Sequence, residues 1–240
     1  MPRFFVENLR EVTIIEGTSA HHIIKSLRMR EGEKITLCNM QGMEGDGKIS
    51  EISEDKVSVS LGEIRPSLSE PNLKITLYVA FPKGDKAEFI IQKAVELGAV
   101  SIVFTDTERC VAKPDNVAFE KKLQRFRKIS AEAAGQSQRG IIPTIFGIIP
   151  FKEAIAEMKK TDAAFMLYEG NCPPMRAEIK KDIKTLSLFT GSEGGFSVAE
   201  VLFAKENNIT PVSLGKRILR CETAPLAALS AVLFLVGDMD

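Results

Sequence analysis

Two loops late in the sequence combine residue types that suit the binding of a small molecule. GSEGGFS at residues 191–197 has three glycines in five positions, and glycine lets a backbone approach a ligand closely. LGKRILRCETA at residues 214–224 places Ile218 and Leu219 among charged residues, as the wall of a pocket for an adenine ring would require. Taken alone, the first loop could also be a tight turn, and the second could be anchored in the core by its two aliphatic side chains.

Signatures of several other classes of site are missing from the sequence. No GxxxxGK[ST] loop is present and no GxGxxG follows the first strand of the α/β region, which argues against P-loop enzymes, Rossmann dehydrogenases and Rossmann-like methyltransferases. The four cysteines form no CxxC pair and the two histidines have no partners at zinc spacing, so we expect a reduced protein without metal. The N-terminus lacks an apolar signal core, and the apolar run at 224–236 is too short for a bilayer, which predicts a cytoplasmic protein.

The N-terminal part of the chain has the pattern of a small β domain. Strands are predicted at residues 4–6, 12–15, 35–38, 47–52 and 57–61. A helix is expected to start after Thr18 or Ser19 and to run through Leu27. Short strands must close or pair to hide their edges, which favours a β-barrel-like domain over residues 1–70. The prolines and serines of segment 65–72 predict a linker.

From Leu73 onward the pattern alternates between strand and helix. The predicted strands are residues 73–80, 100–104, 163–167, 186–190 and 211–214, and the predicted helices include one capped by Asp85 and one at 116–136. Gly98 is expected to end a helix with positive φ, Ser197 and Glu200 to form a capping box, and Thr223 to be an N-cap. The alternation predicts an α/β domain over residues 73–240 with a mostly parallel sheet, whose ligand site lies at the carboxyl ends of the late strands.

The two loops together resemble the signature loops of the bacterial 16S ribosomal RNA uridine-N3 methyltransferases, whose usual forms are GPEGG followed by a small residue and Ser, and LG-x-R-[IV]-LR-x-ETA. The likeness covers nearly all of the chain. Other segments that resemble the family, in the same order, are HHIIKSLRM at 21–29, KGDKAEFIIQKAVELG at 83–98, ERC at 108–110 and AAGQSQRGIIP at 133–143. Ser192, Cys221 and Pro225 depart from the usual pattern, and they affect loop stiffness more than chemistry.

This resemblance implies an enzyme of the SPOUT class that uses S-adenosylmethionine and binds no metal. It further implies a PUA-like β-barrel domain, a C-terminal α/β domain with a deep trefoil knot, and a homodimer with each active site near the partner subunit. The residues expected to contact the cofactor are Leu167, Tyr168, Gly191, Ser192, Glu193, Gly194, Leu214, Gly215, Ile218, Leu219 and Thr223. For Leu167 and Tyr168, ordinary packing at a strand end is the alternative.

Methylation of uracil at N3 sets its own chemical demands. The imino proton must leave N3, and the base must be unpaired or turned out of its stack because N3 lies on the Watson–Crick edge. Arg220 is the first candidate to stabilise the forming uracil anion, followed by Arg109 and Arg139. Glu193 and Glu222 could accept the proton, although glutamates in tight loops more often orient backbone N–H groups; the acceptor could also be water.

The charge of the chain gives little support for RNA binding, since 32 basic and 32 acidic residues cancel. Residues 1–70 contain nine basic and twelve acidic side chains. The candidate RNA contacts are therefore local: Lys25, Arg28 and Arg30 in the N-terminal part, the run of Lys121, Lys122, Arg125, Arg127 and Lys128, and Arg139. Each run could also be a solvated surface. We expect recognition of 16S rRNA by shape, within the assembled small ribosomal subunit.

Two other functions are compatible with the residues. The chain could be a SPOUT methyltransferase that acts on a transfer RNA or on large-subunit RNA. It could also be a catalytically silent RNA-binding factor of ribosome assembly that kept the fold. Binding of S-adenosylmethionine would separate an enzyme from a silent factor.

Overall fold

The computed structural model describes residues 1–113 and 116–239, which form two compact units. The N-terminal unit consists of Met1–Glu70 together with Ala134–Ile142. The C-terminal unit consists of Pro71–Ala133 and Pro143–Asp240. A segment far along the chain is thus part of the first unit. Asp240, with which the second predicted domain ends, lies outside the described residues.

The N-terminal unit is built on a curled sheet with strand order β1-β3-β4-β5-β2. Its strands are β1 (Arg3–Phe5), β2 (Val12–Ile15), β3 (Lys34–Cys38), β4 (Met43–Ile52) and β5 (Val57–Pro66). All five predicted strands are present. The predicted linker at 65–72 begins too early, because β5 pairs with β4 as far as Pro66. Phe4, Ile35, Val57 and other apolar residues of these strands form the core of the unit.

The predicted helix of this unit is present but irregular. Helix α1 (Gly17–His21) runs directly into a π-helical turn, η1 (His22–Ser26). The amide of Leu27 donates to the carbonyl of His22 at 2.9 Å, which is the five-residue spacing of a π-helix. Ala20 and Ile23 are fully buried against the sheet, so tertiary packing supports the turn.

Arg139 lies in the part of the N-terminal unit that comes from late in the chain, and its side chain is only 2% exposed. Its guanidinium donates to Glu70 at 2.6 Å, and Glu70 also accepts from the backbone N–H groups of Gly140 and Ile141. The expectation of Arg139 as an RNA contact, or as a group that stabilises uracil, is therefore wrong, because the side chain is buried and its charge is paired within the unit.

The C-terminal unit has a six-stranded, all-parallel sheet with strand order β11-β9-β10-β6-β7-β8. Its strands are β6 (Lys74–Ala80), β7 (Ser101–Asp106), β8 (Thr144–Pro150), β9 (Ala163–Leu167), β10 (Thr185–Thr190) and β11 (Thr210–Val212). Its helices are α2 (Lys86–Glu96), α3 (Asn116–Gln136), which continues into the N-terminal unit, α4 (Phe151–Met158), α5 (Met175–Glu178), α6 (Val198–Glu206) and α7 (Thr223–Val236). This architecture confirms the predicted fold class.

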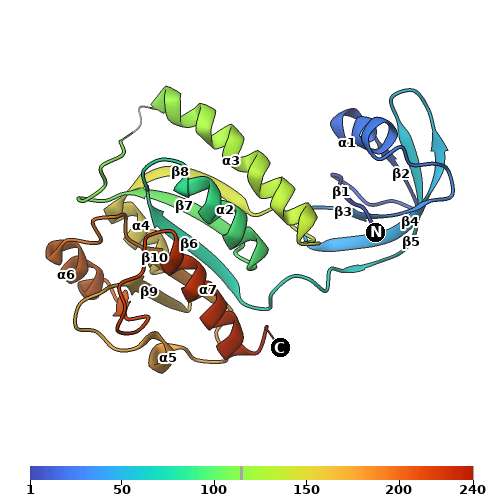
Figure 1. The fold of residues 1–240 in the computed structure, drawn as a ribbon. Helices are drawn as coiled ribbons and strands as arrows, with labels where there is room; N and C mark the ends of the chain where they lie inside the picture. Colours follow the sequence, from blue (N-terminus) through green and yellow to red (C-terminus); the bar gives the residue numbers. More distant parts are fainter. Residues whose placement is uncertain (114–115, 240) are drawn as a thin grey trace. The chain divides into compact units, whose positions relative to one another are not determined.

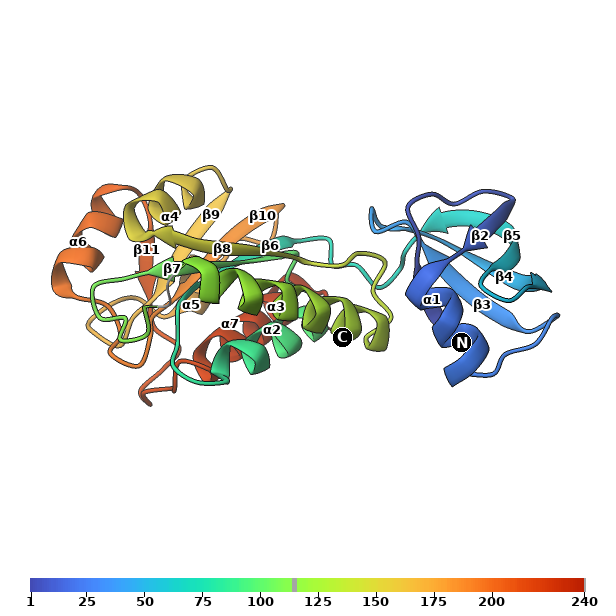
Figure 2. The same cartoon turned by 90° about the horizontal axis from the view of Figure 1, so that it is seen from above.

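Helices cover both faces of the parallel sheet, with α2 and α7 on one face and α4 on the other (Figure 1, Figure 2). Tyr78, Met166 and Phe189 of the sheet pack against Ile155 of α4 and Val201 of α6 in one buried cluster. Both faces are apolar, as a parallel sheet requires. Among the residues that the structure describes, no helix combines the length and the apolar character needed to cross a membrane.

The predicted helix ends are mostly present. Ser197 and Glu200 form the capping box at the start of α6, and Gly98 follows α2 with a φ of 94°. Thr223 as an N-cap is wrong, because Thr223 is already the first residue of α7 and Glu222 precedes it. Asp85 is the N-cap residue of α2, but its side chain makes no capping hydrogen bond.

Candidate active site

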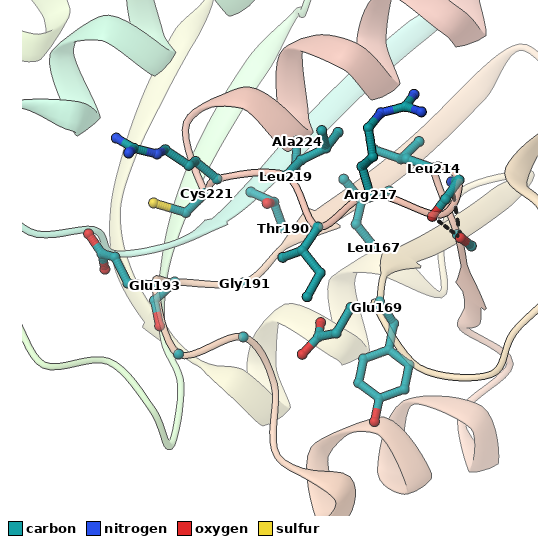
Figure 3. Close-up of a pocket in the computed structure, with 18 of the residues that line it drawn as sticks. Leu167, Glu169, Thr190, Gly191, Glu193, Leu214, Arg217, Leu219, Cys221 and Ala224 are labelled. Atoms are coloured by element: carbon teal, nitrogen blue, oxygen red, sulfur yellow. Dashed lines mark hydrogen bonds between the residues drawn. The ribbon is translucent and has the colours of Figure 1, made fainter.

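A cavity of about 480 Å³ opens at the carboxyl ends of β9, β10 and β11. Figure 3 shows the ends of these strands and the segments after them converging around it, with Leu167 at the end of β9 and Glu169 after it, Gly191 and Glu193 after β10, and Leu214 after β11. The structure brings together these predicted residues around the cavity: Leu167, Tyr168, Gly191, Ser192, Glu193, Gly194, Leu214, Gly215, Ile218, Leu219 and Arg220. These residues lie close together because the carboxyl ends of parallel strands share one edge of the sheet.

Some residues of the cavity were missed by the sequence analysis, and some predicted residues lie outside it. The missed residues are Lys86, Glu169, Thr190, Gly195, Val212, Ser213, Lys216, Arg217, Cys221 and Ala224. Several of these belong to the two motifs or directly flank them, so the motifs themselves were the available signal. Within the described part of the chain, Arg109, Glu222 and Thr223 are not among the lining residues.

The GSEGGFS loop needs glycine at Gly195. The N–H group of Gly195 donates to the carbonyl of Ser192 at 2.9 Å and closes a tight turn, in which Gly195 has a φ of 64°. A Cβ atom at this position would lie 3.0 Å from Oε1 of Glu169, closer than ordinary van der Waals contact. The backbone of this loop therefore faces the cavity without a side chain at this point.

Arg109 fixes the same loop from outside the cavity. Its Nη1 donates to the carbonyl of Gly194 at 2.9 Å, and the Ser192 hydroxyl donates to the carbonyl of Arg109 at 3.2 Å. Next to it, the amide of Glu108 donates to the carboxylate of Glu200 at 2.8 Å. The ERC segment thus positions the GSEGGFS loop, which is the geometric role that the structure provides for Arg109.

The LGKRILRCETA loop supplies apolar groups and three exposed cations, Lys216, Arg217 and Arg220. Leu214 and Leu219 are half-buried in the wall, whereas Ile218 is 85% exposed. Gly215 has a φ of 117°, a conformation in which a residue with a side chain would be strained. Arg220 has an 85% exposed side chain and lies 4.0 Å from Glu222. Its guanidinium is accessible to a substrate that enters the cavity.

A group of four polar side chains connects the two loops at the cavity. The ammonium group of Lys86 lies 2.8 Å from Glu193 and 3.6 Å from Glu222. It also donates to the sulfur of Cys221 at 3.7 Å, and the Cys221 thiol donates to Glu222 at 3.2 Å. Figure 3 shows Glu193 and Cys221 on the same side of the cavity.

The protonation states of this group follow from burial and from hydrogen bonds. Burial favours the neutral acid at Glu193, but hydrogen bonds from Lys86 and from backbone N–H groups outweigh it and hold the pKa of Glu193 below its ordinary value. Burial likewise opposes charge at Glu222, yet its own backbone N–H and Cys221 keep the pKa of Glu222 lowered. Burial, with help from the Glu222 carboxylate, raises the pKa of Cys221 to about 12. At neutral pH the site holds two carboxylates, an ammonium and a neutral thiol.

Apart from the buried Arg139, the candidate RNA contacts lie on exposed parts of the two units. Lys25, Arg28 and Arg30 are exposed after and within the helical turn of the N-terminal unit. On α3, Arg125 is paired with Glu88 at 2.7 Å, and Arg127 and Lys128 lie within 3.8 Å of carboxylates. Lys121 and Lys122 are also exposed. Among the described residues, no group of three or more His, Cys, Asp or Glu side chains could hold a metal ion.

The sequence families that match the chain define its class. The RNA methyltransferase domain matches residues 69–233, and the RNA methyltransferase PUA domain matches residues 15–62. The cavity and nearly all of the C-terminal unit therefore lie within a methyltransferase domain, and most of the curled sheet lies within a PUA domain. Together they define an RNA methyltransferase.

Similar proteins narrow the class to one family. The ribosomal RNA small subunit methyltransferase E of Bacillus subtilis is 36% identical over 245 residues, which cover 97% of this chain and 96% of that protein. The crystal structure of a ribosomal RNA small subunit methyltransferase E from Neisseria gonorrhoeae bound to S-adenosyl methionine has a TM-score of 0.88 at 30% identity, with 98% of each chain covered. A methyltransferase from Legionella pneumophila in complex with SAM has a TM-score of 0.85 at 29% identity, covering 97% of this chain and 96% of that one. The chain belongs to the ribosomal RNA small subunit methyltransferase E family.

Proposed function

We propose that this protein transfers a methyl group from S-adenosylmethionine to N3 of one uridine in 16S ribosomal RNA. The observation that carries the proposal is the meeting of the GSEGGFS and LGKRILRCETA loops around one cavity. These are the two segments that resemble the uridine-N3 methyltransferases. The solved relative from Neisseria gonorrhoeae, which is bound to S-adenosyl methionine, supports the choice of cofactor.

The residues of the cavity fit this cofactor. A volume of about 480 Å³ is within the range of small-molecule sites. Leu167, Leu214 and Leu219 offer apolar surface for an adenine ring, and the glycines at 191, 194 and 195 allow close approach of the backbone. When bound, S-adenosylmethionine supplies a methyl group activated by a positively charged sulfur.

The residues of the chain would promote the reaction mainly through position and charge. Holding donor and acceptor together can lower a barrier by roughly 7 to 11 kcal/mol. The exposed guanidinium of Arg220 can approach a carbonyl oxygen of a uracil and stabilise negative charge as the N3 proton leaves. The carboxylates of Glu193 and Glu222 already accept from or pair with Lys86 and Cys221, so we assign the N3 proton to solvent and not to either glutamate.

The substrate is proposed to be the assembled small ribosomal subunit, bound by a homodimer. The N-terminal part carries more acidic than basic side chains, and three of the five basic residues in the run on α3 are near carboxylates. Such a surface suits the shape of a folded RNA better than a single flexible strand. The remaining phosphate contacts should make activity fall as salt concentration rises.

A methyl-transfer experiment tests the proposal directly. Small subunits that lack the modification are incubated with the protein and labelled S-adenosylmethionine, and the labelled nucleoside is identified by mass spectrometry. The expected result is one 3-methyluridine in 16S rRNA. Label in transfer RNA or large-subunit RNA would favour the other SPOUT activity, and absence of cofactor binding in calorimetry would favour the silent assembly factor.

A further inference from the structure

Lys86 lines the cavity but belongs to neither signature loop. It is the first residue of α2, which follows β6, whereas the two loops follow β10 and β11. Strand β9 lies between β10 and β11 in the sheet, so no pairing of adjacent strands fixes the distance between the two loops. A contact that reaches both loops would fix their separation directly.

The ammonium group of Lys86 makes this contact. Glu193 in the first loop and Glu222 in the second both lie within 3.6 Å of the same nitrogen. An ammonium group has three donors, so it can serve both carboxylates and the sulfur of Cys221 at once. The backbone N–H group of Lys83, three residues earlier, also donates to Glu193 at 3.2 Å. The start of α2 therefore holds the first loop through two donors.

Without Lys86 the two carboxylates would face each other across the loops with less compensation. Arg220 lies 4.0 Å from Glu222, but its side chain is 85% exposed, and Arg109 donates to the carbonyl of Gly194 instead of a carboxylate. Like charges disfavour each other's ionised form and would push the loops apart. Lys86 therefore supplies the positive charge that offsets the carboxylates of Glu193 and Glu222.

We propose that Lys86 is a positioning residue that holds the two loops together through Glu193 and Glu222 and so preorganises the site for the methyl donor. The inference rests on the proposed function. A preorganised site has less loop motion to lose on binding, so its affinity for a ligand is higher. Lys86 acts on the loops, and the transfer of the methyl group is left to the residues that face the substrate.

Binding measurements with matched variants test this role. Lys86→Met should bind S-adenosylmethionine and the neutral product S-adenosylhomocysteine about tenfold more weakly than the wild-type protein, because both ligands need the same closed loops. Lys86→Arg, which keeps the charge, should recover most of this loss. Lys93→Met removes a lysine from the same helix that is paired with Glu96 at 2.8 Å, and it should bind both ligands normally.

A double-mutant cycle separates bridging from a general effect on the fold. Because Lys86 acts through Glu193, the losses of Lys86→Met and Glu193→Ala should be less than multiplicative when the two are combined. In kinetics, the KM for the cofactor should rise more than kcat falls. Thermal unfolding of each variant shows whether the chain is folded at the assay temperature.

The outcomes distinguish this inference from the proposed function. If the wild-type protein does not bind S-adenosylmethionine, the proposed function fails and the inference fails with it. If the wild-type protein binds but Lys86→Met binds equally well, only the inference is overturned. Losses that multiply in the cycle, or a Lys86→Arg variant as weak as Lys86→Met, would also overturn it.

Discussion

Both units contain clusters of oppositely charged side chains, but the two clusters differ in their exposure to solvent. In the N-terminal unit, the side chains of Arg3, Glu44 and Arg139 are 10%, 7% and 2% exposed. In the C-terminal unit, those of Lys86 and Glu193 are 34% and 30% exposed and line a cavity. Buried pairs have their remaining donors and acceptors satisfied by the protein, whereas pairs at a cavity can rearrange around a ligand. Solvent exposure, more than residue type, distinguishes the buried cluster of the N-terminal unit from the cluster that lines the cavity.

The largest effect is expected from removing one charge of the buried cluster in the N-terminal unit. Arg139→Met keeps the volume of the side chain but leaves Glu70 without its ion pair, and it should lower the free energy of unfolding by about 3 to 5 kcal/mol. Arg127→Met is the control, because Arg127 lies 3.8 Å from Glu120 with an exposed side chain and should change stability by less than about 1 kcal/mol. Denaturant unfolding measures both. Equal effects would mean that burial does not distinguish the pairs.

The complementary change is made at the cavity. Arg220→Ala should reduce turnover by about 100-fold or more, as loss of a charge-stabilising donor does elsewhere, while leaving cofactor affinity and stability unchanged. Single-turnover methyl transfer and calorimetry provide the two measurements. Arg176→Ala removes an exposed arginine of α5 as a charge control. Turnover that is unchanged in Arg220→Ala would remove Arg220 from the site.

A smaller effect is expected from adding one carbon to a glycine. Gly17 in the N-terminal unit and Gly195 in the cavity both have a φ of 64°, so alanine should cost each about 1 to 2 kcal/mol of stability. A Cβ atom at Gly17 meets open space, whereas one at Gly195 lies 3.0 Å from Glu169. Gly195→Ala alone should therefore weaken cofactor binding in calorimetry. Equal cofactor affinity in both variants would contradict a close approach at Gly195.

The smallest effect is expected at the candidate RNA contacts on α3. Lys121→Ala should weaken binding to the small subunit a few-fold at low salt and lower the slope of log affinity against log salt by about one. Lys128 lies 3.7 Å from Glu132, so Lys128→Ala should change the slope less. Filter binding over a series of salt concentrations measures both slopes. Identical slopes for the wild-type protein and Lys121→Ala would exclude a phosphate contact at Lys121.

Much of the fold could be predicted from the sequence because local patterns control it. The alternation of strand and helix after Leu73 predicted a parallel sheet, and the capping box at Ser197 and the positive φ at Gly98 depend on residues close in the chain. Strand β8 (Thr144–Pro150) was missed: its sequence, TIFGIIP, contains a glycine and ends in proline, which weaken the strand signal.

The candidate site was predictable only where its residues lie in the motifs. The two loops could be placed together because strand ends of a parallel sheet share an edge. Lys86 was not found, since it comes from a helix about one hundred residues earlier in the chain and nothing in its neighbours indicates its contact with Glu193. Arg139 was assigned to the surface because an arginine usually lies there, whereas its burial depends on Glu70, far away in sequence.

The return of Ala134–Ile142 to the N-terminal unit has a consequence for how the protein is made. During translation, residues 1–70 leave the ribosome first, but Arg139, the ion-pair partner of Glu70, is synthesised much later. The first unit therefore cannot complete its fold until Ala134–Ile142 has been synthesised. For the same reason, a gene fragment that ends at residue 70 encodes only part of this unit, so the unit cannot be transplanted to another protein as one continuous piece.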